Sequence, residues 1–253
     1  MIKFFRKIRQ RLLTENKFSK YLIYAIGEIV LVVIGILIAL SINKYNEDIK
    51  AKKFELKLLK QIEKDLLENK DEYERLWGSY KRQLYSCEYI IHHIKSKLPL
   101  TDSLGHHFLS TKSRTIFSPI NTSYAFLKTS GLNEIKNDSL RIAITKFHEQ
   151  DIILLGIQLD RLLAIQSNQL EPFLIEHFKV KEYEKENEFS NYKTHFSPAV
   201  LPINYDNLIL NEAYANIIGF KIDRLKINLR YLKGCQENLE VLITQLQKET
   251  DST

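Results

Sequence analysis

The chain has 253 residues and a formal net charge of +6, from 37 lysines and arginines against 31 aspartates and glutamates. The first 20 residues carry seven basic residues and one acidic residue, so the rest of the chain has 30 of each and is neutral. A domain that binds nucleic acid needs a basic face of its own, so this distribution argues against a nucleic-acid partner.

Basic and apolar residues are interspersed in segment 1–20, which is the pattern of a basic amphipathic helix that lies on an anionic membrane surface. A positive flank that only orients the following span has the same composition. The segment is predicted to be a cytoplasmic tail. If it is an amphipathic helix on the membrane surface, its partner is membrane lipid. The side chains expected to contact lipid are Lys3, Arg6, Lys7, Arg9 and Arg11.

An apolar run from Tyr21 to Ile42 follows, with Glu28 as its single charged residue. At about 1.5 Å per residue, a helix of 22 residues extends roughly 33 Å, and the hydrocarbon core of a bilayer is roughly 30 Å thick. Residues 21–43 are therefore predicted to form a single transmembrane helix.

The orientation of this span follows from its basic flanks. Basic residues occur on both sides, but those of segment 1–20 are more tightly clustered and come first. This favours a signal anchor with a cytoplasmic N-terminus and residues 44–253 on the other side of the membrane. A signal peptide cleaved near Ala39-Leu40-Ser41 is the competing interpretation.

Glu28 is a candidate functional residue because a carboxylate inside a membrane span is costly. On a helix it shares a face with Gly35 and Ala39, a small-x-x-x-small pair that lets a second helix approach closely. The three residues are candidates for association with a second copy or with another membrane protein. In the alternative interpretation, Glu28 lies near the lipid headgroups and is only tolerated there.

The remainder of the chain has apolar residues spaced three and four apart and no extended alternating pattern, which predicts an all-α fold. The seam of the first helix includes a polar residue, Asn69, and contains a stutter between Tyr80 and Leu84. Long helices are predicted at about 45–98, 139–178 and 205–248, and a short one at 122–129.

These helices are predicted to form an elongated antiparallel bundle over residues 44–253, made of three long helices and one short one. In this arrangement the polar segment 99–121 lies at one end of the bundle, and the charged connection 179–204 lies at the other.

Residues that could carry chemistry are few. His92-His93 and His106-His107 are adjacent pairs, and adjacent residues cannot ligate a metal from one helical face. None of the eight glycines falls in a phosphate-loop spacing. We therefore expect no catalytic residue, no metal and no cofactor.

Cys87 and Cys235 are the only cysteines. Cys87 lies on the seam of the first long helix, and Cys235 neighbours the seam of the last, which runs through Ile218, Ile222 and Leu225. In an oxidising compartment the two could form a disulfide, provided that their Cα atoms come within about 7 Å. Otherwise they are two small buried residues.

Two stretches resemble a family of uncharacterised single-span membrane proteins from flavobacteria and related Bacteroidetes. The first is MIKFFRKIRQRLL followed by ENKFSKYLIYAIGEIVLVVIGILIALSIN, and the second begins at Tyr124 with YAFLKTSGL. The resemblance implies a bacterial inner-membrane protein with residues 44–253 in the periplasm, and it brings no activity. It directs attention to Glu28 and to residues 124–131.

The leading functional hypothesis is a membrane-anchored interaction or scaffold protein of the cell envelope that associates through its transmembrane helix and has no catalytic activity. The alternative is a periplasmic ligand-sensing helical module that works through a membrane partner. An enzyme would require a polar cluster buried among the helices.

Overall fold

The computed structural model describes residues 18–180 and 200–251. Helices make up 87% of these residues, which confirms the all-α class. The chain divides into two compact units, Met1–Lys57 and Leu58–Thr253, called here the N-terminal unit and the helical unit. The helical unit thus begins at Leu58, beyond the residue 44 expected from the sequence.

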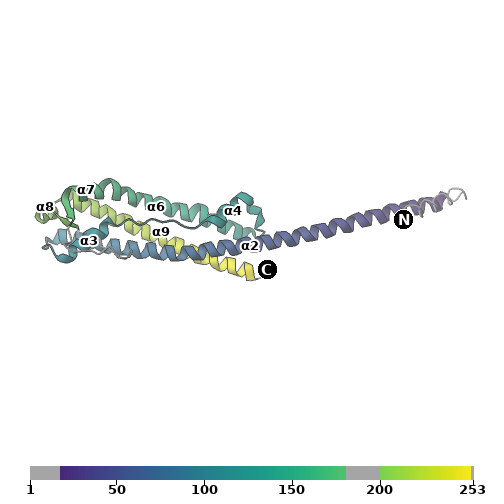
Figure 1. Ribbon diagram of the computed structural model, residues 1–253, viewed down its shortest axis with the longest axis horizontal. Coiled ribbons are helices and arrows are strands. Elements are labelled where there is room, and N and C mark those ends of the chain that lie inside the picture. Colours follow the sequence, from purple (N-terminus) through teal and green to yellow (C-terminus); the bar gives the residue numbers. More distant parts are fainter. Residues whose placement is uncertain (1–17, 181–199, 252–253) are drawn as a thin grey trace, which may run out of the picture. The chain divides into compact units, whose positions relative to one another are not determined.

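Figure 1 shows the elements in chain order. The α-helices are α2 (Phe18–Ser96), α3 (Asp102–Lys112), α4 (Thr122–Ser130), α5 (Asp138–Lys146), α6 (Ile152–Ile165), α7 (Glu171–His177), α8 (Tyr205–Ile209) and α9 (Glu212–Asp251). The shorter elements are the 3-10 turn η1 (Leu132–Glu134), the π-helical segments η2 (Phe147–Asp151) and η3 (Gln166–Leu170), and the strands β1 (Phe178–Val180) and β2 (Val200–Pro202).

Within the helical unit, α2 buries one stripe of side chains. Up to Tyr80 this is the predicted seam, in which Asn69 is only 1% exposed. The predicted stutter at Leu84 is wrong, because the buried positions that continue the seam after Tyr80 are Gln83, Cys87 and Ile90, whereas Leu84 is only partly buried. The spacing between buried residues continues to alternate between three and four. Gln83 keeps this spacing, because its polar side chain is buried at a position where the seam would have an apolar residue.

One continuous helical run extends from Asp138 to His177, with η2 and η3 joining α5, α6 and α7. Pro172 lies in the first turn of α7, directly after η3. Proline has no amide hydrogen, and its ring crowds the carbonyl four residues earlier. The wider π turn at η3 accommodates both effects, so the helix passes the proline without ending.

α9 runs antiparallel to α2 in the helical unit. The amide of Gln247 near the end of α9 donates to Glu63 at 2.9 Å, whereas Lys226 nearer its start pairs with Glu88 at 2.8 Å. Later residues of α9 therefore meet earlier residues of α2.

α9 is also antiparallel to the run from α5 to α7. Asn137, directly before α5, donates to Glu249 at 2.7 Å, and Asn238 donates to Asp151 at 2.8 Å. Since α9 opposes both partners, α2 and the α5–α7 run point in the same direction. A short loop cannot join two parallel helices of this length, so the chain must return along α2 before α5 begins.

Residues 113–121, called here the strap, make that return, and side chains of α2 bind their backbone. Asn69 donates through Nδ2 to the carbonyl of Ile120 and accepts from its amide, both at 2.7 Å. Arg75 donates to the carbonyl of Ile116 at 2.9 Å. An extended segment without a neighbouring strand needs such partners for its peptide groups.

The polar segment 99–121, for which the sequence predicted no helix, contains one. The first part forms α3, with Leu104 and Phe108 buried one turn apart, and only the strap is irregular. Gly105 and the adjacent histidine pair, both poor helix formers, obscured this short helix in the sequence.

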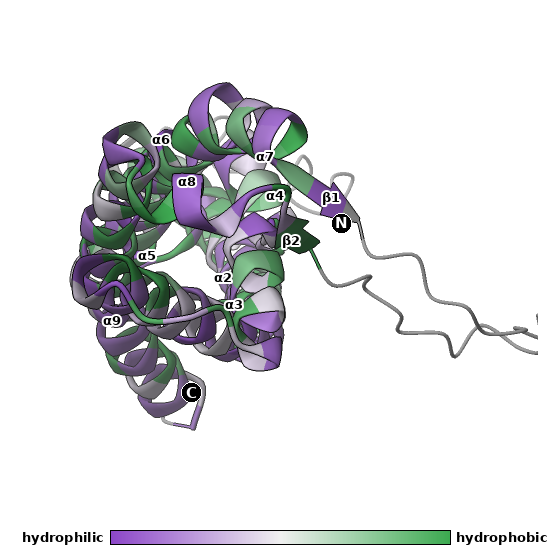
Figure 2. Ribbon diagram, turned by 90° about the vertical axis from the view of Figure 1, so that its left-hand side faces the viewer, coloured by the Kyte–Doolittle hydropathy of each residue, from purple (hydrophilic) through white to green (hydrophobic). Residues whose placement is uncertain are grey.

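The two strands pair antiparallel, with Phe178 opposite Pro202, and lie side by side in Figure 2. The ring of Phe178 packs against Phe108 of α3 at 5.0 Å between centroids. The strands therefore lie at the same end of the helical unit as α3. The prediction of opposite ends is wrong because it did not include the return of the chain along α2.

The helix predicted at 205–248 is interrupted near its start. The side chain of Asn211 accepts from the amide of Tyr214 at 3.0 Å, which caps a new helix. The chain therefore forms α8, a short break, and then α9.

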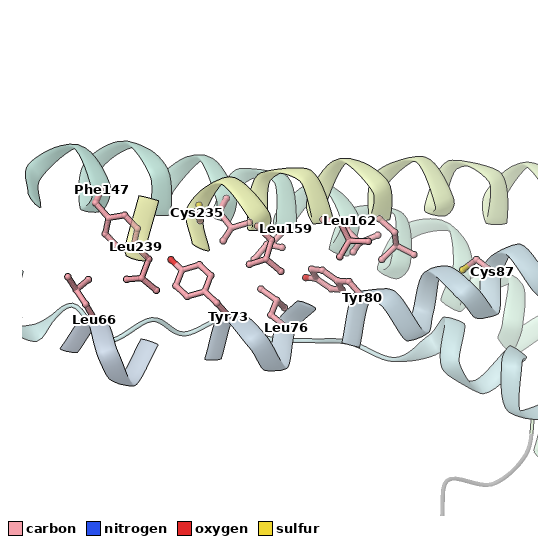
Figure 3. Packing of buried hydrophobic residues seen from close by; sticks show 14 of the residues in the cluster. Leu66, Tyr73, Leu76, Tyr80, Cys87, Phe147, Leu159, Leu162, Cys235 and Leu239 are labelled. Atoms are coloured by element: carbon pink, nitrogen blue, oxygen red, sulfur yellow. The ribbon is translucent and has the colours of Figure 1, made fainter. Parts of the chain in front are cut away.

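Figure 3 shows the core between these helices. Tyr73, Leu76 and Tyr80 of α2 point toward Leu159 and Leu162 of α6, and residues of α9 close the same space. Each of these side chains is at most 5% exposed. Burial of a large apolar side chain contributes about 1.5–3 kcal/mol, so this continuous core stabilises the helical unit.

Candidate functional site

α2 is the one helix among the described residues that is long and apolar enough to cross a membrane, by length and composition. None of its most apolar 18-residue window is buried by the chain. The large apolar side chains between Leu22 and Ile42 whose exposure the structure describes are 46–72% exposed. Ser41 donates its hydroxyl to the carbonyl of Leu37 at 2.8 Å, which satisfies this polar group within the helix.

Glu28, Gly35 and Ala39 all lie on this helix. Positions seven and eleven residues apart return to within about 20° of the same direction at 3.6 residues per turn, so the three residues share one face. A Cβ atom added at Gly35 would meet nothing within 4 Å, so this part of the face is open to an approaching helix. The proposed lipid contacts, Lys3 to Arg11, lie outside the described residues.

The two cysteines are free and buried. Figure 3 places them at different heights, with Cys235 near Tyr73 and Cys87 farther along α2 than Tyr80. Cys235 donates to the carbonyl of Asp151 at 3.3 Å. The structure does not pair the two thiols, and burial raises the pKa of each to about 12, which keeps them protonated and unreactive.

A buried lysine, Lys221 of α9, is the centre of a polar cluster in the helical unit. It is 1% exposed, and its Nζ donates to the carbonyl of Thr111 at the end of α3 and to Oε1 of Gln166 in η3. Gln166 in turn donates through Nε2 to the carbonyl of Lys112 at 3.1 Å. One side chain thus holds three segments together.

The direct partners of Lys221 are neutral oxygens. Burial lowers its pKa to about 8, and Glu171 acts in the opposite direction. Glu171 itself accepts from Nε of Arg114 at 2.8 Å, and the pKa of this carboxyl is lowered mainly by that bond. An uncompensated positive charge in the core is costly, so the neutral amine is favoured there more than in water.

A cavity of about 10 Å³ borders this cluster, lined among others by Lys221, Tyr80, Gln83 and Thr115. This is about the space that one water molecule requires. The arrangement can therefore hold and orient a water beside an amine, but it has no room for an organic substrate.

Sequence reasoning missed Lys221 because lysine is rarely fully buried, and the seam was placed on Ile222 instead. One signal was available, since Lys221 lies three residues after Ile218 and four before Leu225, both of which are buried.

The stretch singled out by the family resemblance begins with Tyr124, whose ring stacks on that of buried His148 at 4.2 Å. Glu149 accepts from the Tyr124 hydroxyl at 3.0 Å and from Lys128 at 2.8 Å. Burial raises the pKa of Tyr124 to about 12 and lowers the pKa of His148. Gly131 ends α4 with φ of 116°, which side chains rarely tolerate. These contacts fix α4 on η2.

Groups of three or more histidine, cysteine, aspartate or glutamate side chains that could hold a metal ion do not occur within residues 18–180 and 200–251. Glu88, which lies one turn before His92, is paired with Lys226.

The model of one protein family, the family of unknown function DUF6090, matches residues 28–179, which is more than half of the chain. The chain belongs to DUF6090. The matched region begins at Glu28 and includes α3, the strap and the Tyr124 contacts, whereas α9 and Lys221 lie beyond it. No curated protein and no solved structure matches the chain.

Proposed function

We propose that this DUF6090 protein is a membrane-anchored helical interaction protein of the cell envelope that associates through its N-terminal helix and carries no catalytic activity. The observation that supports this most is the uncovered apolar surface between Leu22 and Ile42. Such a continuous apolar helix must be covered by lipid or by another helix, because water solvates it poorly.

The face of Glu28, Gly35 and Ala39 is proposed to bind a second copy of the helix. A small residue at position 35 lets two backbones approach, and a carboxyl group in lipid gains from a hydrogen-bond partner across the contact. If the partner is another membrane protein and not a second copy, it is proposed to bind the same face.

Replacing Glu28 and Gly35 together by leucine should convert the associated protein to a monomer in detergent. The leucines remove the polar contact and fill the space that lets the backbones approach. Sedimentation of the full chain in micelles measures the oligomeric mass.

Ser41→Leu is the matched control, since position 41 lies about 140° around the helix from Glu28 and also exchanges a small residue for leucine. The control should keep the oligomeric mass of the unaltered protein. An unchanged mass in the Glu28→Leu/Gly35→Leu variant would contradict association through this face.

The protein is further proposed to lie in a bacterial inner membrane, with the N-terminus in the cytoplasm and the helical unit in the periplasm. The dense basic cluster before the span supports this orientation. Alkaline phosphatase fused after Thr253 should be active, and a reporter that fluoresces only in the cytoplasm should be dark there. Fluorescence without phosphatase activity would place the C-terminus in the cytoplasm and contradict the proposed orientation.

An interaction role fits the helical unit better than a ligand-binding one. Sites for small molecules usually measure about 300–1,000 Å³. The cavity at the buried polar cluster measures about 10 Å³, and a pocket lined by Asn137, Leu140 and Lys248 among others measures about 230 Å³. The cluster is therefore proposed to fix the helices relative to one another, so that the unit offers a partner a defined surface.

A further inference from the structure

The adjacent histidine pairs of the sequence meet in the structure where α3 lies on α2. The ring of Tyr89 packs against His93 of its own helix at 4.4 Å and against His107 of α3 at 4.1 Å between centroids. Nδ1 of His107 lies 3.1 Å from the hydroxyl of Ser86, within hydrogen-bonding distance. Tyr85 packs edge-on against the same His107 ring at 5.6 Å.

Polar contacts of α3 with α2 are concentrated at this cluster. Beside the His107–Ser86 bond, the hydroxyls of Tyr89 and Ser103 lie 3.5 Å apart. The neighbouring face of α3 buries Leu104 and Phe108, each 1% exposed, against the core. Movement of α3 away from α2 would therefore uncover apolar surface at this end of the helical unit.

We propose that His107, in contact with Ser86 and Tyr89 and beside His93, forms a proton-sensitive clasp, which holds α3 on α2 while His107 is neutral and loosens when it is protonated. This device is independent of the proposed membrane association.

The surroundings of His107 oppose a positive charge. Burial, followed by His106 and His93, lowers its pKa. The ring of His92 lies 6.2 Å from that of His93 and adds a third neighbouring imidazole. A positive charge on His107 would therefore lie in a partly dry contact among these imidazoles.

Within residues 18–180 and 200–251, the other groups on the elements packed around the clasp do not supply a counter-charge to His107. Glu88 of α2 is paired with Lys226 of α9 at 2.8 Å. Tyr205 of α8 donates to the carbonyl of Leu98 at 2.8 Å, and β2 contributes only the apolar residues 200–202. Asp102 lies in the first turn of α3, where a carboxylate is stabilised by the helix N-terminus.

The direction of the effect follows from the lowered pKa. Released α3 binds protons more readily than docked α3, so acid favours release and neutral pH favours docking. A difference of one pKa unit between the two states changes the opening equilibrium roughly tenfold.

Hydrogen–deuterium exchange of the full chain in detergent micelles, at about pH 7.5 and about pH 5, tests the clasp. After correction for intrinsic exchange rates, peptides of α3 should lose protection severalfold at the lower pH, whereas peptides of α9 should keep theirs. His107→Gln, which is polar but cannot be protonated, should abolish the loss. His177→Gln, a control on α7, should retain it.

Equal protection of α3 at both pH values in the unaltered protein would overturn the proposal, as would equal losses in α3 and α9. If His107→Gln leaves α3 unprotected even at neutral pH, the His93→Gln/His106→Gln variant decides. Reduced acid sensitivity of its α3 supports the clasp, and undiminished sensitivity overturns it.

Discussion

Lys221→Met should lose stability relative to the unaltered protein as the pH rises, by about 2 kcal/mol between about pH 7.5 and about pH 9.5. Burial lowers the pKa of Lys221 from 10.5 to about 8. Between these values the unfolded chain binds the proton and the folded protein does not. The free energy of unfolding of the unaltered protein therefore gains a term that grows with pH through this window. The Lys221→Met protein lacks this term.

Only the difference between the two proteins isolates this effect. The buried cysteines Cys87 and Cys235 have raised pKa values, so their ionisation in the unfolded chain reduces stability over the same alkaline range. Both proteins carry these thiols, and their contribution largely cancels in the comparison.

Urea denaturation of the full chain in micelles measures this difference, with the fluorescence of Trp77, the only tryptophan, as the probe. Trp77 is partly buried against the core, so its emission reports unfolding of the helical unit. Lys233→Met, at an exposed lysine of the same helix, is the matched control. A pH-independent difference between Lys221→Met and the unaltered protein would show that Lys221 titrates in the folded state as it does in the unfolded chain.

Asn69→Ala should destabilise the helical unit by about 2–4 kcal/mol, because it leaves two backbone groups of Ile120 without partners. Asn69→Asp should cost at least as much at neutral pH. A carboxylate can still accept from the Ile120 amide, but it cannot donate to the carbonyl and would face that oxygen with a negative charge.

Acid should restore part of the stability of Asn69→Asp, since a protonated carboxyl group can donate again. Asn238→Ala is the comparison, because this exposed amide donates one hydrogen bond, to Asp151. Its replacement should lower the free energy of unfolding by no more than about 0.5 kcal/mol. Urea denaturation with Trp77 emission measures all three. A cost below about 1 kcal/mol for Asn69→Ala would mean that water replaces both bonds.

The long helices were accessible from the sequence because apolar residues at spacings of three and four mark the buried face directly. The run from Asp138 to His177 was predicted within one residue at each end. The same rule failed where the buried residue is polar. At Gln83 and Lys221 it selected the neighbouring Leu84 and Ile222, since composition alone does not show which polar groups find partners in a core.

The strap could not be predicted for a related reason. Its path depends on hydrogen bonds from α2 side chains to backbone groups about 40–50 residues away along the chain. Asn69 was recognised as a polar seam position, but its partner is the peptide group of Ile120, which has no signature in the sequence. The histidine clasp likewise requires two segments to meet.

The strap also sets how cooperative the helical unit is. Bringing Ile120 to Asn69 closes a loop of 51 residues, which costs on the order of 3–4 kcal/mol of chain entropy. Two neutral hydrogen bonds contribute only about 1 kcal/mol each, so they do not offset that cost by themselves. The bonds therefore select the path of the strap, and apolar contacts with the core hold it there, such as that of Phe117 with Tyr73 at 5.2 Å between ring centroids. Loop closure and core formation are thus one event.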